Sequence, residues 1–174
     1  MASAPLLVTE AANIFVDNRD KSLIIRDLVL PRLEEIKVAH VPGGAVGEIE
    51  LSLGVRHLEV AFSLAGRDPL SLEYFGASQI AGGFGNTFTI YEALRSKADS
   101  TLQRAVAVVT GRLSAVSFDP FRRGIVAGSA YMITEITSYQ LAINGVLIYD
   151  YNWLLGSFMV NGVEQNAVNA VIQS

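Results

Sequence analysis

The chain has 174 residues, of which 51% are hydrophobic and only 17% are charged, and it carries a net charge of -4 with no cysteine. This length suits one domain that buries a core without disulfides or metal, and the lack of cysteine excludes disulfides and thiol nucleophiles. Because soluble domains usually carry about 25% charged residues, part of this surface must be apolar or neutral. Large apolar patches mark contacts with other chains, so we expect oligomerisation.

Membranes and nucleic acids are poor explanations of this composition. The longest apolar run, Tyr151 to Val160, contains Asn152 and Gly156 and is shorter than the roughly 20 residues of a spanning helix. We therefore expect no membrane insertion by this chain. Residues Met1 to Val8 have no lysine or arginine ahead of their apolar residues, so a signal peptide is not expected. The acidic net charge disfavours general nucleic-acid binding through a basic face.

The N-terminal part of the chain predicts short strands. Asn13–Val16 is expected to be a strand, which the polar turn 17–20 connects to an extended Leu23–Ile25. Residues 32–41 fit either a helical turn or an extended segment. Pro42-Gly43-Gly44 then marks a flexible break.

The clearest predicted unit is a hairpin between Val46 and Leu64, with Gly54 in its tight turn. Apolar side chains alternate with polar ones on both arms, at Ile49, Leu51 and Leu53 and then at Leu58, Val60, Phe62 and Leu64. Period-two alternation indicates strands with one buried face and one wet face. The wet face would carry three glutamates.

A short helix is predicted over Asp68–Phe75, because Asp68 suits the N-cap, Pro69 the first helical position and Gly76 the end. Residues 82–86 are expected to form a loop or a bend in an edge strand. Thr87–Leu94 is expected to be extended.

Two long β-branched runs, 101–118 and 125–143, predict long strands joined by the segment 119–124. A bend at Gly111 or Gly128 would suit a curved sheet or barrel wall. Asn144-Gly145 and Asn161-Gly162 are typical of type I′ turns. The first of these turns would pair Val146–Tyr149 with the preceding strand. The tail from Glu164 to Ile172 is expected to be a helix or an arm that packs on a neighbour.

No set of residues in the sequence indicates catalysis, a cofactor or a metal. His40 and His57 are the only histidines, and they belong to no cluster with ligand spacing. Glu48, Glu50 and Glu59 fit a solvated strand face better than an acid–base pair or a calcium loop. The sequence also lacks a nucleophile elbow and a phosphate-binding glycine loop. We therefore expect no enzyme activity.

Several motifs in order along the chain resemble the major tail tube protein family of contractile-tailed bacteriophages. They are NIFVD at 13–17, LVLPRL at 28–33, Gly43-Gly44 with GEIELSLG at 47–54, Asp68-Pro69 with Phe75-Gly76, GRL at 111–113, YQLAING at 139–145 and FMVNGVE at 158–164. Their order and spacing over nearly the whole chain carry the resemblance. The chain departs from the family at Asn18-Arg19, where a glycine-containing turn is usual, and over 77–105.

The resemblance implies a mostly-β fold, a tail-tube-type β-barrel or sandwich with one short helix and extended terminal arms. It implies a single tail tube domain over residues 1–174. Within this domain we expect an N-terminal arm at 1–12, a β-barrel core at 13–152 and a C-terminal arm at 153–174.

The resemblance also implies a structural role in the virion tail, after assembly in the host cytoplasm. Six copies would form a ring, and stacked rings would make the inner tube through which DNA passes without specific binding. The implied partners are further copies and the sheath, tape-measure, baseplate and tail-terminator proteins. Tubes of phage-like bacteriocins and of type VI secretion share this architecture and remain alternatives. A β-barrel that binds a small apolar ligand in an internal pocket is a further one.

Two sets of residues are candidates for contacts within such a tube. The candidate lumen-facing residues are Glu48, Glu50, Ser52, His57, Glu59 and Ser63. The candidate ring-stacking residues are Glu34, Glu35, Lys37, His40, Pro42, Gly43 and Gly44, and the two terminal arms are also expected to take part in stacking. An acidic bore would repel DNA phosphates and so limit sticking during ejection.

Overall fold

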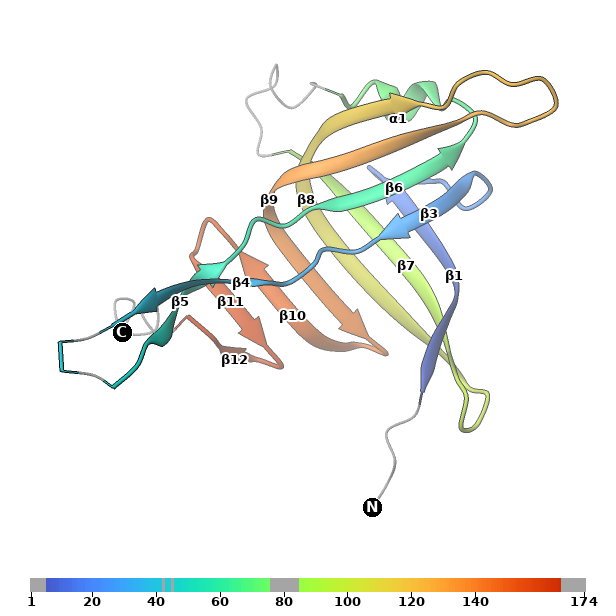
Figure 1. The fold of residues 1–174 in the computed structure, drawn as a ribbon. Helices are drawn as coiled ribbons and strands as arrows, with labels where there is room; N and C mark the ends of the chain where they lie inside the picture. Colours follow the sequence, from blue (N-terminus) through green and yellow to red (C-terminus); the bar gives the residue numbers. More distant parts are fainter. Residues whose placement is uncertain (1–5, 42, 45, 76–84, 167–174) are drawn as a thin grey trace.

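A computed structural model describes residues 6–41, 43–44, 46–75 and 85–166. The predicted mostly-β fold with one short helix is confirmed (Figure 1). The strands are β1 (Leu7–Val16), β2 (Arg19–Asp20), β3 (Ile25–Val29), β4 (Glu35–His40), β5 (Ile49–Val55), β6 (Val60–Ala65), β7 (Asn86–Ser96), β8 (Leu102–Phe118), β9 (Gly128–Ile143), β10 (Val146–Asn152), β11 (Ser157–Val160) and β12 (Val163–Glu164), and the helix is α1 (Pro69–Leu72).

The main sheet is antiparallel and follows the order β12-β11-β10-β9-β8-β7-β1-β2. Strand β9 pairs with β8 along one edge, and its other edge is divided between two partners. Its first half, residues 128–133, pairs with β6, which in turn pairs with β3. Its second half, residues 138–143, pairs with β10. The sheet therefore splits along β9 into two layers that can face each other (Figure 1).

The bend predicted at Gly111 coincides with this division. Thr110 lies opposite Ser138 and Arg112 opposite Thr134, so three residues of β9 face the single residue Gly111. Such a bulge bends the strand and increases its twist. A Cβ atom on Gly111 would lie 2.9 Å from the Cγ2 atom of Ile133, so the close approach of the two strands requires glycine here.

The core lies between the two layers. Its buried side chains include Ile14, Val16, Leu58, Val60, Phe62, Leu64, Phe88, Ile90, Tyr131 and Ile133. The rings of Phe62 and Tyr131 stack with centroids 4.9 Å apart. Each large apolar side chain buried here contributes about 1.5–3 kcal/mol. The alternation predicted along residues 58–64 is thus confirmed as the inward face of β6.

The hairpin predicted between Val46 and Leu64 is wrong. Strand β5 continues through Gly54 to Val55 and pairs with β4, whereas β6 pairs with β3 and β9. Gly54 does adopt a positive φ of 122°, but it does so inside the strand, opposite Ile36, where the register shifts. The two apolar arms therefore belong to different sheets, and residues 35–40 are a strand.

Both predicted Asn-Gly turns are confirmed. Asn144 and Gly145 have φ values of 51° and 82°, and Asn161 and Gly162 have values of 50° and 78°. These positive angles are those of type I′ turns. The turns connect β9 to β10 and β11 to β12.

Several element boundaries differ from the expectation. Strand β1 begins at Leu7, inside the predicted N-terminal arm, and β11 lies inside the predicted C-terminal arm. Helix α1 starts after Asp68 as predicted, but it ends at Leu72. Gly76 and the tail residues 167–172 lie outside the described residues. The division of the chain into core and arms stays a prediction.

Candidate assembly surfaces

The β4–β5 hairpin has two faces of different chemistry. Directly paired residues share a face, so Lys37 and Ser52 lie on one face, together with Ala39 and Glu50. The opposite face carries the pairs Val38–Leu51 and His40–Ile49. We call Val38, Ile49 and Leu51 the apolar hairpin face. All three are exposed, because no described part of the chain covers them. A contiguous apolar strand face of this kind is typical of a contact surface for another chain.

Few of the hairpin's charges are neutralised by ion pairs. Lys37 Nζ lies 3.2 Å from Glu50 Oε2 across the two strands. At the base, Glu34 contacts Arg32 and Arg56 at 3.3 and 3.7 Å. Among the described residues no ion pair includes Glu35 or Glu48. The hairpin therefore presents uncompensated acidic side chains next to its apolar face.

The structure places most of the predicted contact residues on this one hairpin. Glu48, Glu50 and Ser52 come from the candidate lumen set, and Glu35, Lys37, His40, Gly43 and Gly44 come from the candidate stacking set. The two sets therefore do not occupy separate regions of the fold. Glu34 precedes β4, and Pro42 lies outside the described residues.

The remaining candidate lumen residues lie elsewhere. His57 and Glu59 belong to the connection between β5 and β6 and contact each other at 3.1 Å. Ser63 lies on β6 and donates a hydrogen bond of 2.8 Å to Asp27 on β3. The lumen set thus shares no single surface in the isolated chain, and both assignments stay predictions.

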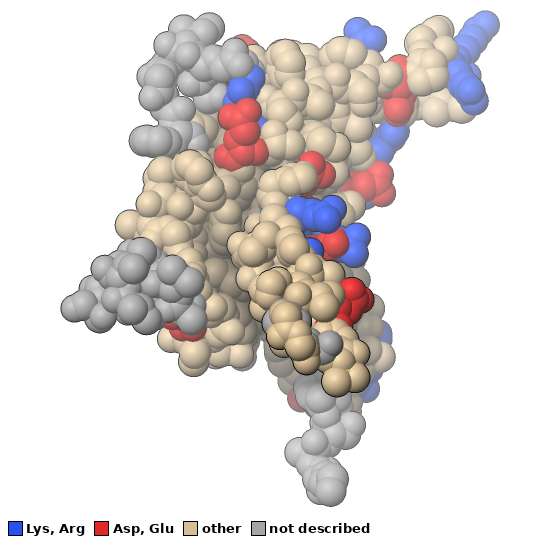
Figure 2. Space-filling model, turned by 60° about the vertical axis from the view of Figure 1, so that its left-hand side comes forward, with Lys and Arg blue, Asp and Glu red and all other residues tan. Residues whose placement is uncertain are grey.

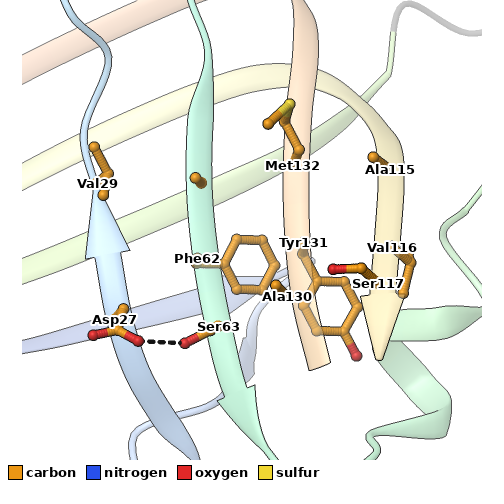
Figure 3. Close-up of a pocket in the computed structure, with 11 residues that line it drawn as sticks. Asp27, Val29, Phe62, Ser63, Ala115, Val116, Ser117, Ala130, Tyr131 and Met132 are labelled. Carbon is orange, nitrogen blue, oxygen red and sulfur yellow. Dashed lines mark hydrogen bonds between the residues drawn. The ribbon is translucent and has the colours of Figure 1, made fainter. Parts of the chain in front are cut away.

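A shallow hollow of about 270 Å³ lies beside Ser63 (Figure 3). On the sheet face opposite the core, its floor is a row of paired residues on four adjacent strands, Val29, Ala61, Met132 and Ala115. A parallel row contains Asp27, Ser63, Ala130 and Ser117. Small side chains create this hollow on the outside of the sheet, whereas the space between the layers is filled by the core. It therefore differs from the internal pocket that a ligand-binding β-barrel would need.

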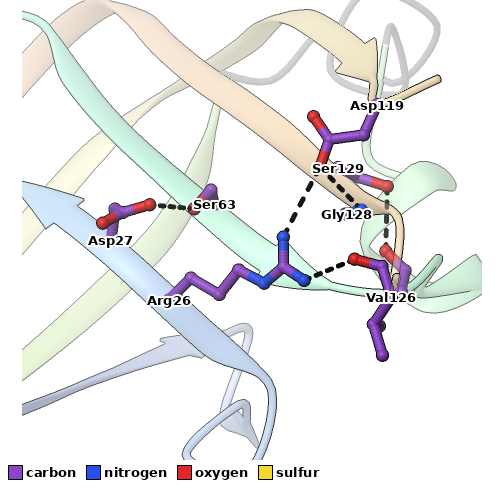
Figure 4. A network of polar contacts seen from close by, with 8 residues as sticks. Arg26, Asp27, Ser63, Asp119, Val126, Gly128 and Ser129 are labelled. Carbon is purple, nitrogen blue, oxygen red and sulfur yellow. Dashed lines mark hydrogen bonds and ion pairs between the residues drawn. The ribbon is translucent and has the colours of Figure 1, made fainter. Parts of the chain in front are cut away.

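The segment that joins β8 to β9 projects from the molecule on a fixed base (Figures 1 and 4). We call residues 119–127 the β8–β9 loop. Asp119 accepts a hydrogen bond of 2.8 Å from the backbone N–H of Gly128, and Arg26 donates one of 2.6 Å to the carbonyl oxygen of Val126. The Arg26 guanidinium also lies 3.5 Å from Asp119. These contacts hold the loop against β3.

The tip of the β8–β9 loop is apolar and basic. Phe121, Ile125 and Val126 are all exposed, and Arg122 and Arg123 lie between them. In the sequence, Arg122 and Arg123 are a basic pair in a turn, which is typical of a solvated turn or of a salt bridge between subunits. The network at its base joins residues about a hundred positions apart, which no local pattern indicates.

A second polar network fixes helix α1. The Nζ atom of Lys21 lies 2.5 Å from Oδ2 of Asp68, which also accepts a hydrogen bond of 2.6 Å from the Ser71 hydroxyl. Burial opposes the ionisation of Asp68, but the hydrogen bonds from Lys21 and Ser71 outweigh it, so the pKa of Asp68 lies below its usual value. The pair therefore ties the residue after β2 to the start of helix α1.

The described residues contain no group of three or more histidine or carboxylate side chains that could hold a metal ion. In the same part of the chain, no helix has the length and apolar character needed to cross a bilayer.

The fold is similar to that of proteins from contractile injection systems. It is similar to a chain of the sheath–tube complex of the extracellular contractile injection system PVC, with a TM-score of 0.56 and 11% identity, covering 76% of this chain and 88% of that one. The PVC sheath/tube terminator matches with a TM-score of 0.59 and 11% identity, covering 82% and 99%. The tube-terminating cap of the anti-feeding prophage matches with a TM-score of 0.60 and 9% identity, covering 82% and 94%.

The family itself follows from the sequence. The model of phage tail tube protein FII matches residues 8–169, so the chain belongs to the phage tail tube protein FII family. The predicted family resemblance is therefore confirmed. A comparison with curated proteins gave no match.

Proposed function

We propose that this chain is the structural subunit of the inner tube of a contractile phage tail, built from stacked rings of six copies. The observation that carries the proposal is the apolar hairpin face, left uncovered in a chain of the tail tube family. Burial of apolar surface drives most protein association. A subunit whose apolar strand face has no partner of its own is suited to assembly and has no evident use as a monomer.

Open strand edges support ring formation. Strand β2 covers β1 only at Phe15 and Val16, so among the described residues nothing pairs with the outer edge of Leu7–Asn13. At the other end of the sheet, β12 pairs with only two residues of β11. Successive antiparallel pairings make β11 antiparallel to β1. Copies related by rotation about an axis along the strands could therefore bring this end of the sheet beside a neighbour's β1, where pairing would cover the open edge of Leu7–Asn13.

The channel of this tube would conduct DNA without binding it specifically. Glu50 and Ser52 lie on the hairpin face opposite the apolar one, as bore-facing residues would if the apolar face is covered by neighbours. The full proposed bore set is Glu48, Glu50, Ser52, His57, Glu59 and Ser63, and the proposed stacking set is Glu34, Glu35, Lys37, His40, Pro42, Gly43 and Gly44. An acidic lining would repel phosphates.

In the particle, the tube would meet sheath, tape-measure, baseplate and tail-terminator proteins. It would assemble in the host cytoplasm and end up in the virion tail, and it would act without catalysis. The same subunit would also suit a phage-like bacteriocin or a secretion tube. Isolation of the native particle distinguishes these functions, because only a phage tail is attached to a capsid that contains DNA.

Electron microscopy of the purified protein tests the assembly. We expect rings or tubes with six-fold symmetry. The variant Leu51→Asp should stay folded by circular dichroism but form no tubes, because it places a charge on the apolar hairpin face. Ser52→Asp is the matched control, since it adds the same charge to the opposite face of the same strand. Wild-type protein that stays monomeric when concentrated, and that occurs in no six-fold particle, would contradict the proposal.

A further inference from the structure

The β4–β5 hairpin and the β8–β9 loop lie at opposite ends of the molecule (Figure 1). Each end exposes large apolar side chains. Val41 and Val46 are exposed at the tip of the hairpin, and Phe121 and Ile125 are exposed on the loop, Phe121 to 85%. Single exposed apolar residues are normal, but a group of them on a projecting segment is typical of a contact site.

The charges of the two ends are opposite. Figure 2 shows that the loop, which projects at the upper right, ends in basic side chains. Among the described residues no ion pair includes Arg122 or Arg123, just as none includes Glu48 next to the tip of the hairpin. The unpaired acidic charge of the hairpin is therefore complementary to the unpaired basic charges of the loop. Such complementarity orients partners and excludes wrong registers.

Both segments are anchored at their bases before any contact forms. The hairpin has a paired ladder from Glu35↔Val55 to His40↔Ile49. The loop is held at its base by Arg26 and Asp119 (Figure 4). Because the bases of both segments are already fixed, contact between the segments costs less conformational entropy than the ordering of two free loops.

We propose that the tip of the β4–β5 hairpin in one copy docks on the β8–β9 loop of a second copy. Val41 and Val46 would pack against Phe121 and Ile125, while Glu48 would face Arg122 and Arg123. The proposal rests on the proposed tube function and deepens it by naming the surface that receives the hairpin.

The two surfaces lie too far apart to meet within one chain. Their contact therefore joins different surfaces of two copies, as in a head-to-tail interface. Each contact uses the hairpin of one copy and the loop of the other, so the second segment of each copy stays free for a further copy and the contact propagates along a ring or a stack. This is the behaviour that a tube subunit needs.

Cysteine cross-linking tests the contact directly, because the chain has no native cysteine. The variant Val46→Cys/Ile125→Cys is assembled and then oxidised. A disulfide forms only where Cα atoms come within about 7 Å. We expect a ladder of covalent dimers, trimers and larger species on a non-reducing gel. The matched control is Val46→Cys/Leu102→Cys, since Leu102 is also exposed but starts β8 at the end far from the loop.

Charge reversal tests the proposed role of the arginines. Arg122→Glu/Arg123→Glu should lower the yield of tubes at least about tenfold, the effect of a lost or inverted charge contact between chains. Adding Glu48→Arg to this variant should recover most of that loss. Arg104→Glu, a reversal at an exposed arginine on the inner strand β8 and outside both segments, should change the yield less than about twofold.

The outcomes separate the two proposals. Tubes that form normally, give no ladder beyond the control and do not respond to the arginine reversal would overturn the docking contact but leave the tube function intact. Wild-type protein that forms no tubes would overturn both. Assembly of the cysteine variant is checked by electron microscopy before oxidation, and the charge variants decide the question if that variant does not assemble.

Discussion

Strands β5 and β6 carry the same alternation of apolar and polar residues, but the apolar residues of β6 are buried and those of β5 are exposed. On β6, Val60, Phe62 and Leu64 are exposed to 0%, 3% and 0%. On β5, Ile49, Leu51 and Leu53 are exposed to 56%, 45% and 65%. The difference is the second layer, which the described part of the chain supplies for β6 and not for β5. A period-two pattern therefore predicts an apolar face that must be buried, but it does not indicate whether the same chain or another chain buries it.

The largest expected effect contrasts these two strands. Phe62→Ala should lower the free energy of unfolding by about 3–5 kcal/mol, because it removes a stacked ring from the core and leaves a cavity. Leu51→Ala should change it by less than about 0.5 kcal/mol in dispersed protein, because the side chain is exposed. Urea denaturation of both variants at low concentration measures the difference. Similar losses for the two would mean that the hairpin is covered within its own chain.

The local features of the fold were predictable from the sequence. The Asn144-Gly145 and Asn161-Gly162 turns were predictable, because a type I′ turn needs positive φ at only two residues and Asn-Gly provides both of them. The long strand β8 was predictable, because β-branched residues recur through its run AVAVVT at 105–110. The partner of β5 was not. Gly54 is compatible with a turn or with a bulged strand, and the distinction depends on residues 35–40, which showed no decisive pattern.

The candidate site was predictable only as a set of segments. The sequence indicated that residues 34–59 carry exposed charges and glycines, which the structure places mostly on one hairpin. The β8–β9 loop was indicated only by the basic pair Arg122-Arg123, and the network at its base could not be predicted, since Arg26 and Asp119 come together only in the folded sheet. The face of each hairpin residue also depends on the pairing register, which follows from the partner strand.

A second contrast concerns the buried ion pair of Lys21 and Asp68. Asp68→Asn should lower the free energy of unfolding at pH 7 by about 3 kcal/mol, because it leaves the Lys21 ammonium buried without its counter-charge. Thermal or urea denaturation measures the loss. A change smaller than that of a typical surface variant would show that the pair is hydrated.

The same pair predicts a pH dependence. The pKa of Asp68 is lower in the folded chain than in the unfolded chain, so its contribution is fully present above the unfolded value, about 3.9. It is lost as the pH falls through the lower folded value. Wild-type stability should therefore decrease in this acidic range, and Asp68→Asn should show a shallower decrease. Parallel curves for the two proteins would contradict the assignment.

A smaller effect is expected at the bend of β8. Gly111→Ala should destabilise the protein by about 1–3 kcal/mol, because its new methyl group would overlap Ile133 and Ile136. Gly47→Ala, at the hairpin tip, is the control, since a Cβ atom there meets nothing within 4 Å. It should change stability by less than about 0.5 kcal/mol. Equal effects at the two positions would show that the bulge relaxes around the added methyl group.

The smallest effect concerns the second lysine–carboxylate pair, Lys37–Glu50, which has the same chemistry as Lys21–Asp68 in a different environment. Its side chains are exposed to 51% and 66%, against 5% and 12% for the buried pair. Water screens an exposed pair, so Glu50→Gln should cost about 0.5 kcal/mol or less in dispersed protein, and less still in 1 M salt. Denaturation at two salt concentrations measures this. A loss as large as that of Asp68→Asn would mean that the polar face of the hairpin is already desolvated before assembly, and the two regions would then differ less than their exposure indicates.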